Sequence, residues 1–471
     1  MNRLVEQSIN ETVDGMQQRL TDYACGIDYN NLTPEAIHAA KVRVIDTLGA
    51  LIGGFFGEPC RIARNMAARM PDPAGATVIG TRMKTSPDMA AFVNATTARY
   101  VELNDVYHWP DSIESHPSDM LPPLLGLAEH LHASGRDFIT SSVLAYEVSL
   151  RIGDVFPNRD FDYTTFQCLG TAAGAGKLLG LSARELSHCI AMAIVPNNVL
   201  RQVRTSHLSM WKVLAAGHTG RAGIFAAMLA REGVDGPHLP FEGKAGWCDH
   251  VARKKLSLDV MGGNGTPFRI QDTLIKQRSS CATTISSILA AEKVAPALKN
   301  INDVKQVTVE VYQFAKERMG TGEHHWNPSS RETADHSIPY VTAAALVYGT
   351  VTPREFNDAH LWNPELRALL KKIEVVTNDE FTEIYERPSV LPVHPTRVTV
   401  ITNSGERIVG ESGGDKGDLS EHKSDAQIAE KFRGLTEEFL GVKRVNAILD
   451  RLWNLDQLEN VAVIPPDFVL D

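Results

Sequence analysis

One short segment places a histidine where a helix is expected to begin. In IESHPSDMLPP, residues 113–123, His116 stands directly before a Pro-Ser-Asp run and two further prolines. Ser115 or Ser118 can cap a helix there, and the prolines favour its first turn, so a purely structural role is reasonable. A helix start also disfavours a protonated histidine and offers free N–H groups to anions. His116 is therefore a candidate base or hydrogen-bond donor beside a bound carboxylate.

The residues just upstream of this segment strengthen the functional interpretation. YVELNDVYHW, residues 100–109, contains Glu102, Asp105, Tyr107 and His108. These four side chains can all exchange or hold protons, and they precede a single helix. A site for proton transfer is the chemistry that such a group would serve.

A second segment, residues 200–223, carries several cations. Arg201, Arg204, His207 and His218 fit a solvated loop followed by an amphipathic helix, and for most of them that interpretation is preferred. Lys212 differs because it opens an Ala/Gly-rich helix that we expect to be buried. A buried ammonium requires a partner, and a bound carboxylate is one such partner.

The third segment is NPSSRETADHSIPYVTAAAL, residues 327–346. Thr333 or Asp335 can cap the helix that begins there. Charged or titratable residues gather around this helix start, and they indicate either the wall of a polar pocket or a structural cap network. They are Arg331, Asp335, His336 and Tyr340.

About the first 260 residues show the pattern of successive helices. Thr33 can cap and Pro34 can open a segment with apolar residues at helical spacing. Further helices are expected to start near residues 124, 142, 184 and 212, most of them rich in Ala and Leu. Small residues, as in GTAAGAGK, allow helices to pack closely. This part of the chain is predicted to form an all-helical body.

The pattern changes after about residue 265. Alternating valines predict a strand over 305–312, 373–377 is a second strand candidate, and 397–411 predicts a hairpin turning at 403–405. Helices are expected at about 281–293 and 339–349. The fold class is therefore mainly α with a second α+β domain. From residue 424 the chain is helical again, and these helices could either stand alone or pack back on the first domain.

Composition excludes several classes of protein. The 471 residues carry a net charge of −10, which argues against a nucleic-acid partner. The longest apolar run, 42–56, contains Arg43 and Asp46, so no membrane partner is expected, and the N-terminus lacks the apolar core of a secretory signal. We therefore expect a cytoplasmic protein. The six cysteines lack zinc-site spacing, and GTAAGAGKLL departs from a phosphate loop at Thr171 and Leu178.

Five motifs, in their order along the chain, resemble those of the MmgE/PrpD family. They are DTLGALIGG at 46–54, HPSD at 116–119, WKVLAAG at 211–217, RETADHSIPY at 331–340 and DAQIAEKF at 425–432. Each motif alone is weak, but their order spans nearly the whole chain. The resemblance implies a large all-helical domain built from residues 1–268 and 412–471, with an inserted α+β lid domain at 269–411.

The resemblance also implies an activity. It points to a homodimeric enzyme without cofactor or metal that acts on small anionic di- or tricarboxylates in a cleft between the domains. By position, the site residues of the family fall on Asp105, His116, Lys212 and Tyr340. Arg201 or Arg204 would assist Lys212 in binding a carboxylate, and His336 would lie in the same site.

Two departures from the family pattern bear on which substrate the site would bind. Tyr163 stands where many members have a histidine, and it is a candidate substrate-binding residue at that position. Ile285 takes the place of a second His or Gln in the lid helix. Arg278 replaces an aromatic residue in the turn before that helix, where it could bind a different carboxylate or face solvent.

Loss of water from a hydroxy di- or tricarboxylate such as 2-methylcitrate is the first choice of reaction. His116 and Tyr340 are the candidate base and acid, in either order, and Asp105 would orient His116 or contact a substrate hydroxyl. The same residues could serve a decarboxylase or an epimerase. A non-catalytic helical interaction protein with a decayed site is the remaining alternative.

Overall fold

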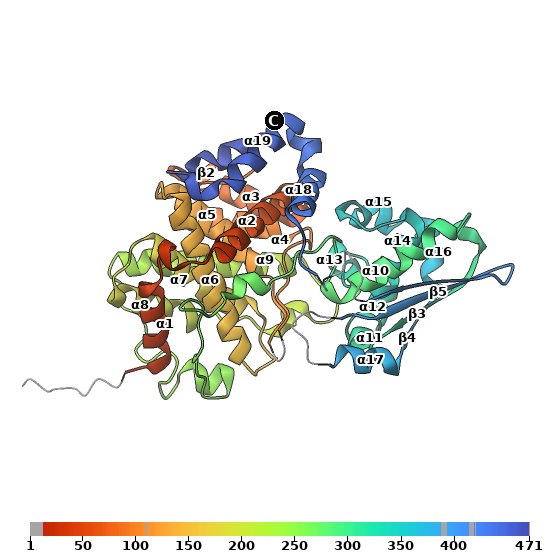
Figure 1. Ribbon diagram of the computed structural model, residues 1–471, viewed down its shortest axis with the longest axis horizontal. Helices are drawn as coiled ribbons and strands as arrows, with labels where there is room; N and C mark the ends of the chain where they lie inside the picture. Colours follow the sequence, from red (N-terminus) through yellow and green to blue (C-terminus); the bar gives the residue numbers. More distant parts are fainter. Residues whose placement is uncertain (1–12, 110–111, 388–392, 414–418, 420, 471) are drawn as a thin grey trace, which may run out of the picture.

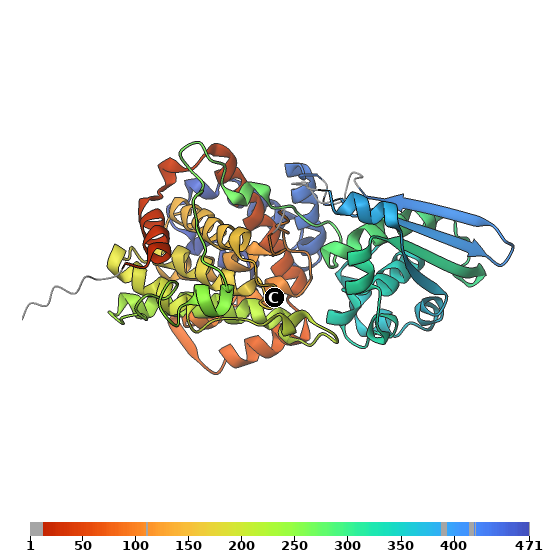
Figure 2. The same ribbon diagram turned by 90° about the horizontal axis from the view of Figure 1, so that it is seen from below.

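Two regions with separate hydrophobic cores make up the chain, and they lie side by side (Figures 1 and 2). The computed structural model describes residues 13–109, 112–387, 393–413, 419 and 421–470. We call the larger region the helical body. Its helices are α1 (Gly15–Gly26), α2 (Pro34–Gly54), α3 (Glu58–Ala67), α4 (Pro87–Arg99), α5 (Leu121–His130), α6 (Gly135–Val155), α7 (Thr164–Leu178), α8 (Ala183–Ile194), α9 (Trp211–Arg231), α18 (Asp425–Leu440) and α19 (Val442–Trp453).

The predicted helix starts in the body are largely confirmed. The Thr33 hydroxyl accepts the Ala36 N–H at 3.2 Å, and Pro34 takes the first position of α2. Helices α5, α8 and α9 begin within three residues of the predicted starts, whereas α6 begins at Gly135, seven residues before the expected position. The prediction of an entirely helical body is wrong in one detail, because β1 (Pro71–Thr77) and β2 (Lys84–Thr85) pair as a small antiparallel sheet.

Helix α9 is the central helix of the body. It packs against α4 and α7, and a Cβ added at Gly217 would lie 2.2 Å from Thr96 Oγ1. Small residues are therefore required for this close packing. By length and composition α9 could also cross a membrane, but 61% of its most apolar window is buried inside the protein. That burial is typical of a core helix.

The C-terminal helices pack back on the body, which was one of the two arrangements left open by the sequence. Helix α18 lies along α2, and Ile428 and Phe432 belong to the core of the body. The Lys431 ammonium lies 2.6 Å from Asp46 Oδ1. Both ends of the chain therefore contribute to one core.

The second region, which we call the α+β region, has its core on a four-stranded mixed sheet. The strand order is β4-β3-β5-β6, with β3 and β4 parallel and the other two pairs antiparallel. The predicted strands and helices of this region are confirmed to within two residues at each end. The elements are α10 (Ala282–Val294), β3 (Val304–Val311), α11 (Gln313–Met319), α12 (Glu323–Trp326), α13 (Arg331–Ala334), α14 (Ile338–Tyr348), α15 (Asp358–Leu361), α16 (Pro364–Leu370), β4 (Ile373–Thr377), α17 (Asp379–Tyr385), β5 (Thr396–Thr402) and β6 (Arg407–Ser412).

Candidate active site

A cavity of about 400 Å³ is lined by residues of both regions. Its wall is unusually rich in cationic and imidazole side chains. Among the described residues, five arginines, five histidines and one carboxylate line it: Arg99, Arg159, Arg201, Arg204 and Arg318; His108, His116, His324, His325 and His336; and Glu114. Such a surface attracts small anions.

His116 lies at the edge of this cavity, at the start of a short 3₁₀ turn (Pro117–Met120) that leads into α5. Its Nδ1 lies 2.7 Å from the Asp105 carbonyl oxygen, which can only accept a hydrogen bond. The proton therefore resides on Nδ1, and Nε2 carries the lone pair. Burial, followed by the charges of Arg99 and Lys276, lowers the pKa of His116 well below its ordinary value. His116 is thus a neutral base at physiological pH.

Glu102 is the centre of a buried cluster of charges behind His116. Its carboxylate lies 2.8 Å from Arg99 Nη1 and 3.0 Å from both Lys212 Nζ and Lys276 Nζ. Burial alone would raise the pKa of Glu102, but these cations, Arg99 foremost, hold it well below the usual range. Glu102 also has a positive φ of 55°, which is uncommon for a residue with a side chain. The backbone is held there by the surrounding ion pairs.

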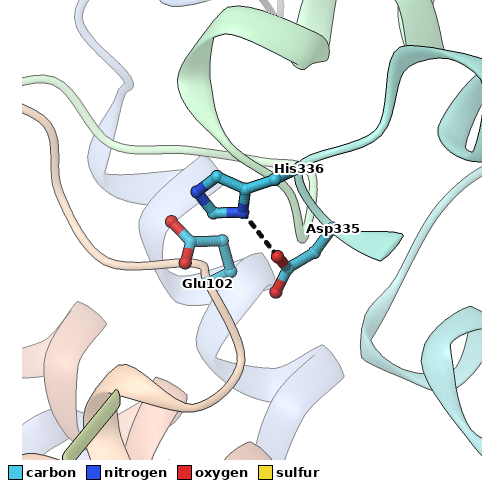
Figure 3. Close-up of side chains that lie close together, drawn as sticks. All are labelled: Glu102, Asp335 and His336. Carbon is cyan, nitrogen blue, oxygen red and sulfur yellow. Dashed lines mark hydrogen bonds and ion pairs between the residues drawn. The ribbon is translucent and has the colours of Figure 1, made fainter. Parts of the chain in front are cut away.

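Lys212 joins Glu102 to Asp335 and His336. Its Nζ lies 2.7 Å from Asp335 Oδ1 and 3.2 Å from His336 Nδ1. Figure 3 shows Glu102, Asp335 and His336 turned toward one another, with His336 Nδ1 2.6 Å from Asp335 Oδ1. The ligand atoms of these three residues lie within 4.8 Å of one another, a spacing that could suit a metal ion. Here the Lys212 ammonium makes the contacts that such an ion would make.

Tyr163 forms a second wall beside His116, with 5.5 Å between the ring centroids. Its hydroxyl oxygen accepts hydrogen bonds from Arg204 Nη2 at 2.7 Å and Arg99 Nε at 3.3 Å. Burial raises the pKa of Tyr163, although the two arginines oppose that effect. The phenol therefore remains protonated, and its own hydrogen is available to an acceptor in the cavity.

Arg201 and Arg204 enter the cavity from the short turn Arg201–Arg204 and differ in their partners. Arg204 pairs with Asp162 Oδ2 at 2.8 Å and lies over the Tyr163 ring. The Arg201 side chain, in contrast, makes no ion pair or hydrogen bond with any residue that the structure describes. Burial lowers the pKa of Arg201, and the nearby Arg318 and Arg204 lower it further. This cation is therefore available to an anionic ligand.

Five of the nine residues proposed from the sequence line the cavity, namely His116, Tyr163, Arg201, Arg204 and His336. Lys212 does not line it but contacts His336. The partner expected for Lys212 was a bound carboxylate, whereas its observed partners are protein carboxylates.

Three predicted site residues are placed elsewhere. Asp105 is buried, and its carboxylate accepts hydrogen bonds from the Ser118 N–H and the Tyr146 hydroxyl, so it holds His116 through its backbone carbonyl instead. Tyr340 lies in the core of the α+β region and donates its hydroxyl hydrogen to the Glu355 carbonyl. Arg278 pairs with Glu292 through two nitrogens, at 2.6 and 2.8 Å.

The local helix interpretations also need correction. Ser337, rather than Thr333 or Asp335, caps α14 by accepting the Tyr340 N–H. Neither Ser115 nor Ser118 caps the turn after His116. On α10, Thr283 lines the cavity whereas Ile285 is buried among apolar residues.

Several residues of the site were missed from the sequence. Arg99 ends α4 and Lys276 lies in a loop, and neither position has a distinctive spacing. The doublet His324–His325 in EHHW was a usable signal, because two adjacent imidazoles are groups that can exchange protons near neutral pH, and both line the cavity.

Comparison with known proteins gives two family matches. The MmgE/PrpD N-terminal domain matches residues 18–258, and the MmgE/PrpD C-terminal domain matches residues 279–455. Three relatives align over most of their length. They are cis-aconitate decarboxylase of Homo sapiens (25% identical, covering 93% of this chain and 91% of the relative), mitochondrial 2-methylcitrate dehydratase of Yarrowia lipolytica (24%, 82% and 77%) and 2-methylcitrate dehydratase of Salmonella typhi (23%, 94% and 94%).

Proposed function

Because this chain belongs to the MmgE/PrpD family, we propose that it is a lyase that removes water from a hydroxy di- or tricarboxylate. The relatives are named as dehydratases and decarboxylases, which supports a lyase reaction at the family level. The residues of the cavity are the basis for choosing among these reactions.

The observation that carries the proposal is the Arg201 guanidinium, which lines the cavity without an ion pair among the described residues. A largely buried cation is costly unless an anion accompanies it. Arg204, Arg99 and Arg318 line the same cavity and add positive charge. A planar carboxylate suits the forked donors of a guanidinium. Carboxylates are therefore the ligands we expect.

His116 is the proposed base. Elimination begins with removal of a proton from the carbon next to a carboxylate, and Nε2 of neutral His116 can accept that proton. The developing negative charge spreads into the carboxylate, where the guanidinium of Arg201 stabilises it.

Tyr163 is the proposed acid. Its hydroxyl hydrogen passes to the departing hydroxyl, which leaves as water, while His116 keeps the proton taken from carbon. The resulting phenolate would be stabilised by Arg204 and Arg99, which already donate to that oxygen. Both side chains return to their starting state by proton exchange with solvent. Tyr163 thereby takes the role first considered for Tyr340, whose hydroxyl is engaged by Glu355.

The remaining charged residues would position the site. Glu102 and Lys212 hold the loop beneath His116 and connect it to His336 of the α+β region. We propose that the α+β region acts as a lid, because its residues complete a wall of the cavity. Closure of a lid excludes water and strengthens the interactions of charged groups.

Decarboxylation is the second candidate, favoured by the human relative named cis-aconitate decarboxylase. In that reaction the carbanion forms by loss of carbon dioxide and takes up a proton afterwards. An acid such as Tyr163 would be needed, but no base would have to remove a carbon-bound proton.

Proton NMR in deuterated water tests these alternatives. The purified protein is incubated with a panel of hydroxy and unsaturated di- and tricarboxylates. Loss or addition of water supports the dehydratase, and release of carbon dioxide supports the decarboxylase. Exchange of the α-proton without net conversion indicates an epimerase. No reaction with any member of the panel would contradict the proposed function.

Two variants make the result specific. His116→Gln removes the imidazole and is expected to abolish turnover. His207→Gln removes an exposed imidazole that does not line the cavity, and turnover should be unchanged. Equal turnover by the two variants would exclude His116 as the base.

A further inference from the structure

Resting on the proposed function, we propose that Glu114 determines the substrate class by accepting a hydrogen bond from a hydroxyl or nitrogen group of the substrate. The favoured ligand then carries a carboxylate and a neighbouring hydrogen-bond donor that lies beside Glu114. A ligand with a further carboxylate in place of that donor is rejected.

Glu114 is the one carboxylate that lines the cavity among the described residues. It is half-buried, and its side chain makes no ion pair or hydrogen bond with the described part of the chain. Five arginines line the same cavity, so the absence of pairing is unexpected for a carboxylate in this place. An unpaired acceptor that faces a cavity is available to a ligand.

Glu114 acts electrostatically on residues of both regions. Burial lowers the pKa of Arg201 and of His108, which line the cavity on the side of the helical body, and the charge of Glu114 opposes that effect at both. It also raises the pKa of Tyr385, which lines the cavity on the side of the α+β region. Glu114 therefore contributes a negative field inside an otherwise cationic space.

The negative charge of Glu114 disfavours the binding of a ligand carboxylate beside it. Two like charges in contact repel each other more strongly in a partly buried cavity than in bulk water, because the effective dielectric constant is lower there. A ligand carboxylate held beside Glu114 would pay that cost, whereas a hydroxyl or ammonium would form a charge-assisted hydrogen bond. The residue thus discriminates by repulsion as well as by attraction.

Arg201 supplies the opposite charge. Both Arg201 and Glu114 line the cavity, both lack ion-pair partners among the described residues, and they do not pair with each other. A ligand that places a carboxylate at Arg201 and a donor at Glu114 would satisfy both groups together. Hydroxy- and amino-dicarboxylates have this arrangement.

Isothermal titration calorimetry with four ligands at one pH tests the proposal. Malate and aspartate carry the donor as hydroxyl and ammonium, and succinate lacks it. Tricarballylate carries a carboxymethyl group at that carbon, which adds a third carboxylate. The wild-type protein is expected to bind malate or aspartate at least about tenfold more tightly than succinate, as one charge-assisted hydrogen bond allows. Tricarballylate should bind more weakly than succinate.

Two substitutions at Glu114 distinguish a hydroxyl donor from an ammonium donor on the ligand. Glu114→Met removes the acceptor and its charge, so the preference over succinate should disappear and tricarballylate should gain affinity. Glu114→Gln keeps an acceptor oxygen, so a preference for malate should persist in part while a preference for aspartate is lost. Glu374→Gln makes the same charge change at an exposed side chain on β4 and should leave every ratio unchanged.

The outcomes distinguish the two proposals. If no ligand binds the wild-type protein, the proposed function itself fails. If the ligands bind and the ratios are the same in Glu114→Met as in the wild type, the role of Glu114 is overturned while the carboxylate site stands.

Discussion

The Lys212 ammonium lies 2.7 Å from Asp335 Oδ1, although 123 residues separate the two. Lys212 belongs to α9 of the helical body, and Asp335 follows α13 in the α+β region. Both side chains are buried, so this ion pair fixes one region against the other directly behind the cavity.

Breaking this pair should destabilise the protein. Lys212→Met leaves two buried carboxylates without their shared cation, and we expect a loss of about 3–5 kcal/mol in the free energy of unfolding. Urea unfolding measures this value. Lys299→Met, at an exposed lysine, should change it little. Adding Asp335→Asn to Lys212→Met should recover part of the loss, and strictly additive effects would argue against a direct interaction.

Removal of the Arg201 guanidinium should weaken carboxylate binding without destabilising the fold. In Arg201→Met no ion pair with a described residue is lost, so the melting temperature should be unchanged or higher. The dissociation constant of a bound dicarboxylate should rise by about 10- to 100-fold, as expected for one charge-assisted hydrogen bond. Arg69→Met is the matched control at an exposed position. Unchanged binding in Arg201→Met would remove the main support for the proposed function.

Two tyrosine variants separate the proposed acid from a core residue. Tyr163→Phe keeps the ring beside His116 but removes the hydroxyl, and we expect kcat to fall by about 10²- to 10⁴-fold. Tyr340→Phe removes a hydrogen bond to Glu355 and should cost about 1 kcal/mol of stability with little change in kcat. Steady-state kinetics and thermal unfolding of both variants measure these effects. The reverse pattern would restore Tyr340 as the acid.

Buried neutral histidines should make the protein sensitive to acid. Burial lowers the pKa of His394 to about 3, whereas an unfolded histidine titrates near 6.5. Between these values the unfolded state binds the proton and the folded state does not. The free energy of unfolding therefore falls as the pH drops, by up to about 1.4 kcal/mol per pH unit for this residue. His394→Gln should reduce that slope, measured by urea unfolding from pH 7 to pH 4, and His207→Gln should not.

The rate constant kcat/KM should stay high in moderately acidic solution, because the base is also a buried neutral histidine. The pKa of His116 is lowered well below its ordinary value, so the base stays neutral as the pH falls through 6.5. The acid limb of kcat/KM is therefore expected well below the pH at which an ordinary histidine titrates. An acid limb of the wild-type profile centred near 6.5, the ordinary value for histidine, would contradict this prediction.

Local sequence patterns predicted the elements well, because caps and periodicity act over a few residues. Thr33 caps α2 as predicted, and 373–377 forms β4. The site depends on contacts between distant parts of the chain, such as Lys276 with Glu102, which are 174 residues apart. Position in a motif also fails to fix where a side chain points: Tyr340 lies in the motif segment 331–340, yet its hydroxyl is turned to the Glu355 carbonyl.

The contact between Lys431 and the Leu103 carbonyl has a consequence for synthesis of the chain. These residues are 328 positions apart, and the contact supports the loop that carries Glu102. Until α18 has left the ribosome, the face of α2 that it covers stays exposed, and the loop lacks this support. An exposed apolar helix face in a partly made chain is a target for chaperones and for aggregation. Nascent chains that stop before α18 should therefore be retained by chaperones, and completion of the body should release them.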